Sequence, residues 1–468
     1  MKRLSALICI IAILFVFAGC GKNPAGGTTS SYETMRINGV DVAEYQIVCD
    51  TDGNEYAPRA AAYIQESIKT LTGHTLAIVD GENASAARKI VVGESSCALS
   101  AELDEATCGV AFSMLAKDGS VALEADYFVI AAAAYYFVDT YVKAGDVTIE
   151  DGTLVREPIQ KQAKNYILLI GDGMGVYQTR LFDYLTDTSD YSDGEDLFYG
   201  YMLPYQGFSR TRSFSGITDS AAGGTALATG YKTQNGYVGL DRDGRELKSL
   251  TELAAELGKS TAVMSTEAST GATPASFSAH ADSRNSSTEI TNDQIALTER
   301  YGTLIRCRSY TQYAERYLKG NEDRIVDTLN TLGEDGDGFF LMYEEAYIDK
   351  HCHNNDMEQT FLALLSFNQA IARFMEYAFY HPDTVVIITA DHETGMLTPN
   401  GDGTLSYHSG DHTDADVPVF AWGEGAAYFD AKEIENIEIA HHLASLMGVD
   451  NFGDRTGAWH DEIYGQAE

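Results

Sequence analysis

Two apolar segments of this chain end in side chains that can bind metal ions. The run 166–171 ends at Asp172, which glycines flank, and the run 384–390 ends at Asp391 and His392. Runs of this length predict buried strands, and ligands bind at the carboxyl ends of strands in open α/β sheets. The glycines leave room for a metal to approach Asp172, although a purely structural turn is the alternative. We expect the three side chains at one edge of a sheet.

A helix start supplies a candidate nucleophile. Residues 218–230 read Thr-Asp-Ser-Ala-Ala-Gly-Gly-Thr-Ala-Leu-Ala-Thr-Gly, which places Ser220 near the first turn of a helix. Free backbone N–H groups at that end attract a phosphate, and a serine there can attack it if its pKa is lowered. The alternative is that Asp219 or Ser220 only caps a packing helix.

The segment 339–353 combines a strand with a helical turn. The strand carries Glu344, and the turn carries Asp349 and His353, which are four residues apart. On one helical turn these two side chains face the same way, so they can share a zinc ion. Cys352 is a competing zinc ligand on chemical grounds.

Two of these motifs together, Gly-Asp-Gly-Met-Gly at 171–175 and Thr-Asp-Ser-Ala-Ala at 218–222, resemble the alkaline phosphatase family. The family pattern continues with a Thr-Pro-Ala segment and with an arginine eleven residues after its threonine. Thr273 and Arg284 meet both requirements. A guanidinium fork matches two phosphate oxygens, which gives Arg284 a chemical role.

The last ligand of the family pattern is a histidine that precedes a strand. His412 stands before the Val-Pro-Val-Phe segment 417–420 and matches it, while His408 is the alternative. The other histidines outside these motifs are treated as structural.

The resemblance implies two Zn²⁺ ions and one Mg²⁺ ion. The three implied ligand sets are Asp349, His353 and His412 for one zinc, Asp172, Asp391 and His392 for the other, and Asp172, Thr273 and Glu344 for magnesium. Nitrogen with carboxylate suits tetrahedral zinc, and oxygen suits octahedral magnesium. The resemblance further implies a phosphoserine intermediate on Ser220, with Arg284 on the phosphate oxygens.

The chain departs from the family pattern near the magnesium ligands. Gly271 stands where many relatives carry Asp or His, and Lys350 follows Asp349 as in some bacterial members. The outer shell of the magnesium site is therefore partly missing or rebuilt, and Glu267 and Glu345 are the candidates for rebuilding it. The segment between Arg284 and Glu344 is also short for the family, which leaves metal preference and oligomeric state open.

The N-terminus is typical of an exported lipoprotein. Residues 1–19 form a signal peptide with Lys2, Arg3 and an apolar core, and the Phe-Ala-Gly-Cys box ends at Cys20. The apolar core is short for a membrane span. We expect a lipid anchor on Cys20, a flexible linker over 20–31, and an extracytoplasmic, membrane-anchored enzyme. Ordinary signal cleavage is the alternative.

The net charge bears on the class of partner, and the cysteine content bears on disulfide bonding. The net charge is −37, which argues against nucleic acid as a partner. Besides Cys9 and Cys20 an odd number of cysteines remains, so no disulfide framework follows. Cys97 and Cys108 are the one pair that a short loop could bring together.

A domain boundary is expected near residue 158. The N-terminal part, 32–158, shows a helical pattern over 57–71, a strand over 89–93, a hairpin over 112–124 and a helix over 131–142. It resembles the noncatalytic α/β domain that precedes the barrels of β-hexosaminidases and α-glucuronidases. Glycan contact is one role that this resemblance implies, and a spacer is the other.

The catalytic domain is expected over 159–468. We predict an α/β sandwich of three layers, whose mostly parallel central sheet carries the metals at its C-terminal edge, and a phosphate monoester as substrate. A phosphodiesterase or sulfatase of the same superfamily is the alternative. Thr273 and Glu344 argue against a diesterase, and Ser220 lacks the Cys/Ser-x-Pro-x-Arg setting of sulfatases. A glycan-binding surface protein with an inactive phosphatase fold is a third possibility.

Overall fold

The computed structural model describes residues 34–50, 54–103, 109–185, 197–309, 315–402 and 404–465. These residues fall into two units, Met1–Gln160 with Met375–Pro382, and Lys161–Phe374 with Asp383–Glu468. The predicted signal peptide, linker and Cys20 lie outside the described residues, as does Cys108. Within the described ranges, no helix is long and apolar enough to cross a membrane. The predicted noncatalytic and catalytic roles of 32–158 and 159–468 stay predictions.

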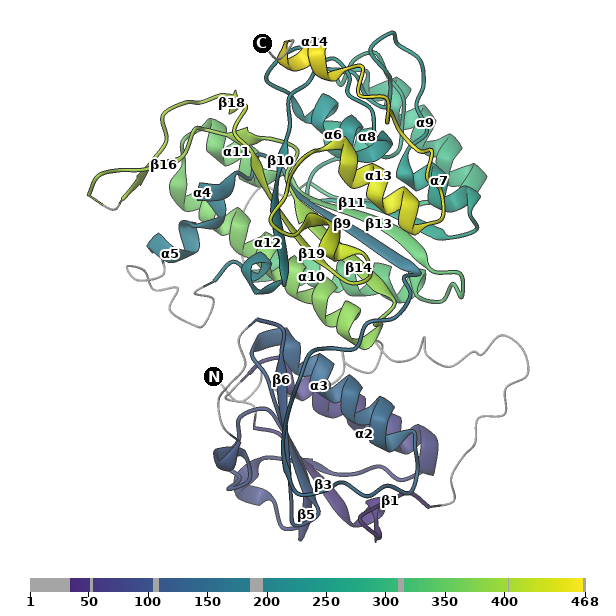
Figure 1. Ribbon diagram of the computed structural model, residues 1–468, viewed down its shortest axis with the longest axis vertical. Helices are drawn as coiled ribbons and strands as arrows, with labels where there is room; N and C mark the ends of the chain where they lie inside the picture. The colour runs from purple at the N-terminus through teal and green to yellow at the C-terminus, as the bar shows by residue number, and fades with distance from the viewer. Residues whose placement is uncertain are drawn as a thin grey trace. The chain divides into compact units, whose positions relative to one another are not determined.

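An eight-stranded sheet forms the centre of the larger unit (Figure 1). In spatial order its strands are β12 (Leu304–Cys307), β11 (Ser260–Ser265), β13 (Phe339–Glu345), β9 (Asn165–Gly171), β14 (Thr384–Thr389), β19 (Val417–Trp422), β10 (Tyr205–Arg210) and β20 (Glu433–Glu435). The strands from β12 to β14 run parallel, and β19 is antiparallel to both of its neighbours. The prediction of a mostly parallel central sheet is confirmed.

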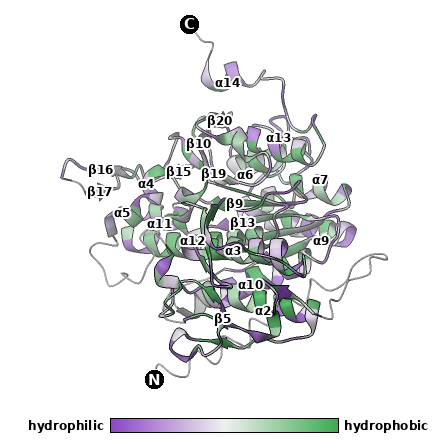
Figure 2. Ribbon diagram, turned by 60° about the horizontal axis from the view of Figure 1, so that its bottom comes forward, coloured by the Kyte–Doolittle hydropathy of each residue, from purple (hydrophilic) through white to green (hydrophobic). Residues whose placement is uncertain are grey.

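The central strands β9, β13 and β14 are buried along their whole length. Strands covered on both faces read as continuous apolar runs, which is why the sequence shows no polar alternation here. Figure 2 shows hydrophobic residues along β9 and β13. Alternate side chains of each strand then serve opposite layers of the fold.

Helices pack on one face of this sheet in a single buried cluster. They are α6 (Ser220–Thr229), α7 (Leu250–Glu256) and α13 (Ile437–Leu446), whereas α8 (Ala272–Ser276) packs with α6 in a separate small cluster. Leu168 and Ile170 of β9 lie in this cluster with Leu227, Leu253 and Leu443 from the helices. Burial of each such side chain contributes about 1.5–3 kcal/mol.

The opposite face carries α10 (Glu315–Leu332) and α12 (Met357–Tyr380). The ring of Tyr343 in β13 lies 6.3 Å from that of Phe367 and 5.4 Å from that of Phe374, both in α12. The Tyr343 hydroxyl accepts a hydrogen bond from Asn321 Nδ2 of α10 at 2.8 Å. Helices thus cover both faces of the sheet, which confirms the three-layer α/β fold.

The smaller unit has its own six-stranded sheet. Its strands, in spatial order, are β4 (Ile78–Val79), β3 (Tyr45–Val48), β5 (Arg88–Val92), β7 (Ser120–Glu124), β6 (Phe112–Lys117) and β8 (Gly152–Arg156). The predicted hairpin is β6–β7, and it turns at Asp118 and Gly119 with φ of 50° and 75°. Two positive φ values in a two-residue loop match the strand twist.

Two helices accompany the small sheet. The predicted helix over 57–71 is α2 (Ala57–Thr72), which ends at the left-handed Gly73. The predicted helix over 131–142 is only partly regular. Its first part is α3 (Ile130–Phe137), and its last turn widens so that the Lys143 N–H donates to Val138 O, five residues back, at 2.9 Å.

Candidate metal-centred active site

The carboxyl ends of three adjacent parallel strands bring the predicted ligands together. Asp172 follows β9, Glu344 lies near the end of β13, and Asp391 and His392 follow β14. All four side chains are buried. The structure therefore places these residues at one sheet edge, as the apolar runs predict.

The structure shows why a glycine, Gly173, follows Asp172. Its φ is 74°, and a Cβ on it would lie 2.8 Å from the Cα of Asp349. Its N–H donates to Asp391 Oδ1 at 3.2 Å. A side chain at residue 173 would push α11 (Tyr347–His353) away from the sheet edge.

A short strand pair carries His412 to this edge from far along the chain. The strand β15 (Glu393–Thr394) directly follows His392 and pairs antiparallel with β18 (His412–Thr413). In this register Thr394 lies opposite His412. The rings of His392 and His412 stack with centroids 3.7 Å apart.

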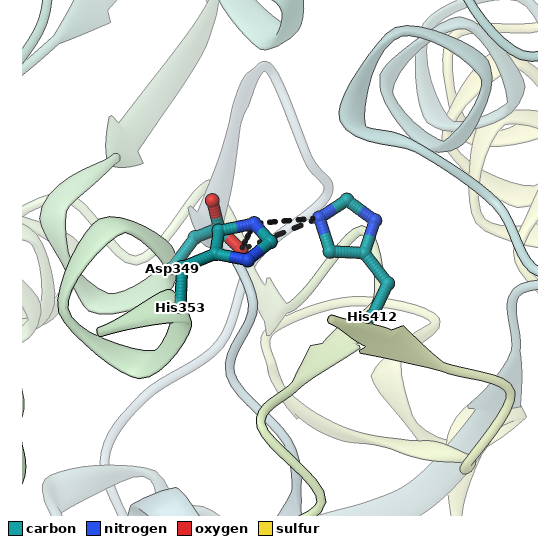
Figure 3. Close-up of side chains that lie close together, drawn as sticks. All are labelled: Asp349, His353 and His412. Carbon is teal, nitrogen blue, oxygen red and sulfur yellow. Dashed lines mark hydrogen bonds and ion pairs between the residues drawn. The ribbon is translucent and has the colours of Figure 1, made fainter. Parts of the chain in front are cut away.

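The first candidate metal group consists of Asp349, His353 and His412 (Figure 3). His353 Nε2 lies 3.1 Å from His412 Nε2, and both nitrogens lie within 3.5 Å of Asp349 Oδ1. His353 Nδ1 donates to Gly410 O at 2.6 Å, and His412 Nδ1 donates to Thr218 O at 2.9 Å.

These hydrogen bonds determine what the two Nε2 atoms can do. A carbonyl oxygen only accepts, so each Nδ1 carries a proton and the neutral imidazole presents a lone pair at Nε2. Two lone pairs at 3.1 Å repel each other unless a cation or a proton lies between them. Metal-bound histidines commonly donate their other N–H to a carbonyl in this way. With the carboxylate of Asp349, the donor set fits a zinc ion.

The second group centres on His392. Its Nε2 lies 3.2 Å from Ser220 Oγ, 3.5 Å from Asp172 Oδ1 and 3.3 Å from Asp391 Oδ2. Asp172, Asp349 and His392 also bring one ligand atom each to within 4.8 Å of one another. The structure thus brings the predicted ligands of the second zinc together, with Asp349 beside them.

Thr394 orients His392 and is a residue that the motifs did not indicate. Its Oγ1 donates to Asp349 Oδ1 at 2.6 Å and lies 3.2 Å from His392 Nδ1. Since its own proton goes to Asp349, Thr394 accepts the Nδ1 proton and leaves the Nε2 lone pair facing the carboxylates. Burial lowers the pKa of His392 well below its usual range, and His412 lowers it further, which keeps this imidazole neutral.

The third group consists of oxygens only. Asp172 Oδ1, Thr273 Oγ1 and Glu344 Oε1 are buried, and none of them forms a hydrogen bond of good geometry within the described residues, although the Thr273 hydroxyl is close enough to Glu344 to lower its pKa. The other Glu344 oxygen accepts a hydrogen bond from Ser265 Oγ. Buried oxygens without hydrogen bonds destabilise the folded state, and a cation that binds oxygen ligands removes this free-energy cost. The predicted magnesium ligands therefore fit that ion.

The carboxylates of the site repel one another when they are ionised, and this repulsion raises their pKa values. Burial, with the nearby carboxylate of Asp349 as the second cause, raises the pKa of Asp391 to about 7. Burial also raises the pKa of Asp172, to which Asp391 and Asp349 add. Divalent cations are the charges that keep such a cluster ionised at neutral pH.

Ser220 opens α6 and points at the His392 side of the site. Asp219 is the N-cap, since its carboxylate accepts the Ala222 N–H at 3.0 Å, so Ser220 is free of the capping role. Asp219 Oδ2 also accepts from Arg284 Nη1 at 3.1 Å. Asp219 therefore positions both the helix and Arg284. The sequence indicated only the capping role.

The two alternative ligands lie outside these groups. Cys352 Sγ is buried 3.4 Å from the Tyr407 hydroxyl, and burial raises its pKa to about 12, so it remains a thiol. His408 belongs to neither candidate metal group of the described residues. The geometry favours His353 and His412 over both.

Known proteins share this chain's larger unit. Residues 163–313 and 319–408 match the family model described as alkaline phosphatase. Alkaline phosphatase 3 of Bacillus subtilis (strain 168) is 29% identical over 361 residues, which cover 62% of this chain and 78% of that protein. Alkaline phosphatase 4 of the same strain is 30% identical over 304 residues, 53% of this chain and 65% of that protein.

Solved structures agree with this relationship. The alkaline phosphatase from the Antarctic bacterium TAB5 is 26% identical with a TM-score of 0.53, over 62% of this chain and 99% of that chain. A variant of that enzyme was solved with Mg bound. The Thermus thermophilus alkaline phosphatase, 17% identical with a TM-score of 0.54 over 62% of this chain and 92% of that chain, shares the fold. Because the family model spans more than half of the residues, this chain belongs to the alkaline phosphatase family and is a hydrolase of the phosphatase type.

Proposed function

We propose that this protein hydrolyses phosphate monoesters with two Zn²⁺ ions and one Mg²⁺ ion, through a phosphoserine intermediate on Ser220. The observation that carries the proposal is the convergence of ligand atoms around one serine. His392 Nε2 carries no proton in the tautomer described above, so its lone pair is available to a metal ion. This nitrogen lies 3.2 Å from Ser220 Oγ and within 3.5 Å of Asp172 and Asp391. The family relationship supports the same reading.

The residues divide the reaction between them. When bound, the metal ions would polarise phosphate oxygens and lower the pKa of the attacking hydroxyl. The Ser220 hydroxyl loses its proton to solvent, and its Oγ bonds to phosphorus as the bond to the leaving alcohol oxygen breaks and that oxygen takes up a proton. Water then cleaves the phosphoserine, which releases phosphate and restores the hydroxyl. Arg284 and the N–H groups at the start of α6 bind the remaining oxygens through both steps.

The test is hydrolysis of a chromogenic phosphate monoester, compared with the matching diester and sulfate. The protein is first stripped with a chelator and then given zinc and magnesium. We expect monoester turnover only when both metals return. A preference for the diester or the sulfate would place the protein in another branch of the superfamily. Glycan binding without any hydrolysis would support an inactive phosphatase fold.

Arg284 should contribute mainly to binding of the phosphoryl group. Arg284→Ala should lower kcat/KM by roughly 10²-fold, because one charged donor to the reacting oxygens is lost. Arg284→Lys should recover little, since an ammonium group lacks the planar fork. Arg242, an exposed arginine paired with Glu462, is the matched control, and Arg242→Ala should leave steady-state kinetics unchanged. Equal kinetics for Arg284→Ala and the wild type would contradict the assignment.

We also propose that the enzyme works outside the cytoplasm, anchored through lipid on Cys20. The leader and the Phe-Ala-Gly-Cys box of the sequence support this. In the native cell the wild type should remain with the membrane fraction, whereas Cys20→Ser should lose that association. A wild type that fractionates as freely soluble protein would rule out the anchor.

A further inference from the structure

The backbone conformation of residue 271 does not require a glycine, so Gly271 must be explained by its surroundings. It precedes α8 with φ of −58°, a value that any residue adopts, and it stands two residues before Thr273. A Cβ on Gly271 would lie 1.8 Å from Glu267 Oε1 and 2.2 Å from Glu267 Cδ. The side chain of Glu267 therefore occupies the space that a side chain at residue 271 would fill.

Glu267 joins the magnesium end of the site to Lys350. Glu267 follows β11, and its Oε2 accepts from Lys350 Nζ at 2.8 Å. The Glu267 side chain is 17% exposed, and Lys350 stands next to Asp349 on α11. Ser265 Oγ accepts a hydrogen bond from the Glu267 N–H at 2.9 Å and donates one to Glu344 Oε2. Glu267 is thus close to Glu344 as well as to Lys350.

The other candidate for this position has different partners. Glu345 Oε1 accepts from Thr266 Oγ1 at 2.9 Å, and Glu345 Oε2 accepts from Ser366 Oγ at 2.8 Å. Consecutive residues of a strand point to opposite faces, so Glu345 points away from the face on which Glu344 lies. Of the two glutamates, Glu267 is the one beside the oxygen ligands.

We propose that Glu267 is a positioning residue of the magnesium site and reaches it through the space that Gly271 leaves open. This inference rests on the proposed function of the same site. Among the described residues, Thr273 Oγ1 and Glu344 Oε1 are buried oxygens that form no hydrogen bond of good geometry. Magnesium retains several waters in protein sites, and a carboxylate beside the ligands can accept their protons in hydrogen bonds. By pairing with Lys350, Glu267 also holds a cation at a defined place beside the metal cluster.

A double-mutant cycle on Glu267 and Gly271 tests this role. The quantity measured is the Kd for Mg²⁺ of the zinc-loaded protein, obtained by equilibrium dialysis. Glu267→Ala should weaken Mg²⁺ binding by about 10- to 100-fold, the usual effect of losing an outer-shell partner. Gly271→Ala should do the same, because its methyl group displaces the Glu267 carboxylate. The double variant should be no weaker than Glu267→Ala alone, since both changes remove one interaction.

Rescue separates a positioning role from a structural one. Gly271→Asp in the Glu267→Ala background should restore Mg²⁺ affinity to within about threefold of the wild type, because the new carboxylate begins where the old one ended. Glu256→Ala, which breaks an exposed ion pair with Lys248, is the matched control and should leave the Kd unchanged. Additive effects of the single changes, an unaltered Kd, or failure of the rescue would overturn the proposal.

The outcomes distinguish this inference from the proposed function. Monoesterase activity with an unchanged Mg²⁺ Kd in Glu267→Ala would remove only the role of Glu267. Mg²⁺ binding that follows the predicted cycle, in a protein without monoesterase activity, would remove the proposed function and retain Glu267 at the metal site.

Discussion

Ser220→Ala should lower kcat for phosphate monoesters by roughly 10³-fold or more and should leave no phosphorylated protein. The hydroxyl lost is the one that forms the bond to phosphorus in the proposed mechanism, and among the described residues Ser220 Oγ, 3.2 Å from His392 Nε2, is the hydroxyl that contacts this nitrogen. The proposed metal ligands and Arg284 are unchanged in the variant, so substrate should still bind. Steady-state kinetics together with acid-quenched labelling would measure both effects.

A matched serine controls for helix stability. Ser287 is the exposed first residue of α9 (Ser287–Tyr301), the same helical position that Ser220 holds in α6. Ser287→Ala should leave kcat and the labelled fraction unchanged. Phosphorylated protein that persists in Ser220→Ala would show that another group is the nucleophile.

Removal of the metals should make stability depend strongly on pH. In the unfolded chain Asp391 and Glu344 titrate near 3.8 and 4.5, whereas in the folded chain without metal burial raises their pKa values to about 7 and about 8. The folded state then binds more protons than the unfolded state between about pH 4 and pH 8. The free energy of unfolding must therefore fall as the pH rises through this range.

Thermal unfolding of the chelated protein measures this effect. Its Tm should be lower at pH 8 than at pH 6, and zinc with magnesium at pH 8 should raise it again, because ligands of the folded state add about 2.7 kcal/mol at a hundredfold excess over Kd. Asp391→Asn should reduce the slope with pH, which separates the site from the overall acidity of the chain. A Tm of the chelated wild type that does not change over this range would contradict the account.

The sequence was informative where one physical requirement acts over a short segment. The apolar runs before Asp172 and Asp391 predict buried strands, and their parallel arrangement places both carboxylates at one edge. The spacing of Asp349 and His353 predicts a shared face on one helical turn, and the two side chains do meet. Strand burial and helical spacing both depend on residues that are close together in the chain, so a single sequence is enough to predict them.

Features that depend on how side chains pack could not be predicted from the sequence. Thr394 orients His392, and its contact with Asp349 depends on how α11 lies against β15. The Glu267 side chain fills the space beside Gly271, whereas the sequence could only name Glu267 and Glu345 as candidates. The wide last turn after α3 is a further feature that helical periodicity does not show.

Identification of the phosphorylated residue decides whether Ser220 is the nucleophile. The protein loaded with zinc and magnesium would be mixed with a phosphate monoester at mildly acidic pH, quenched in acid, digested, and analysed by peptide mass spectrometry. We expect a single phosphorylated site, Ser220, whose label disappears when substrate is exhausted. A phosphoryl group on another residue, or turnover of the monoester with no phosphorylated peptide, would contradict this expectation.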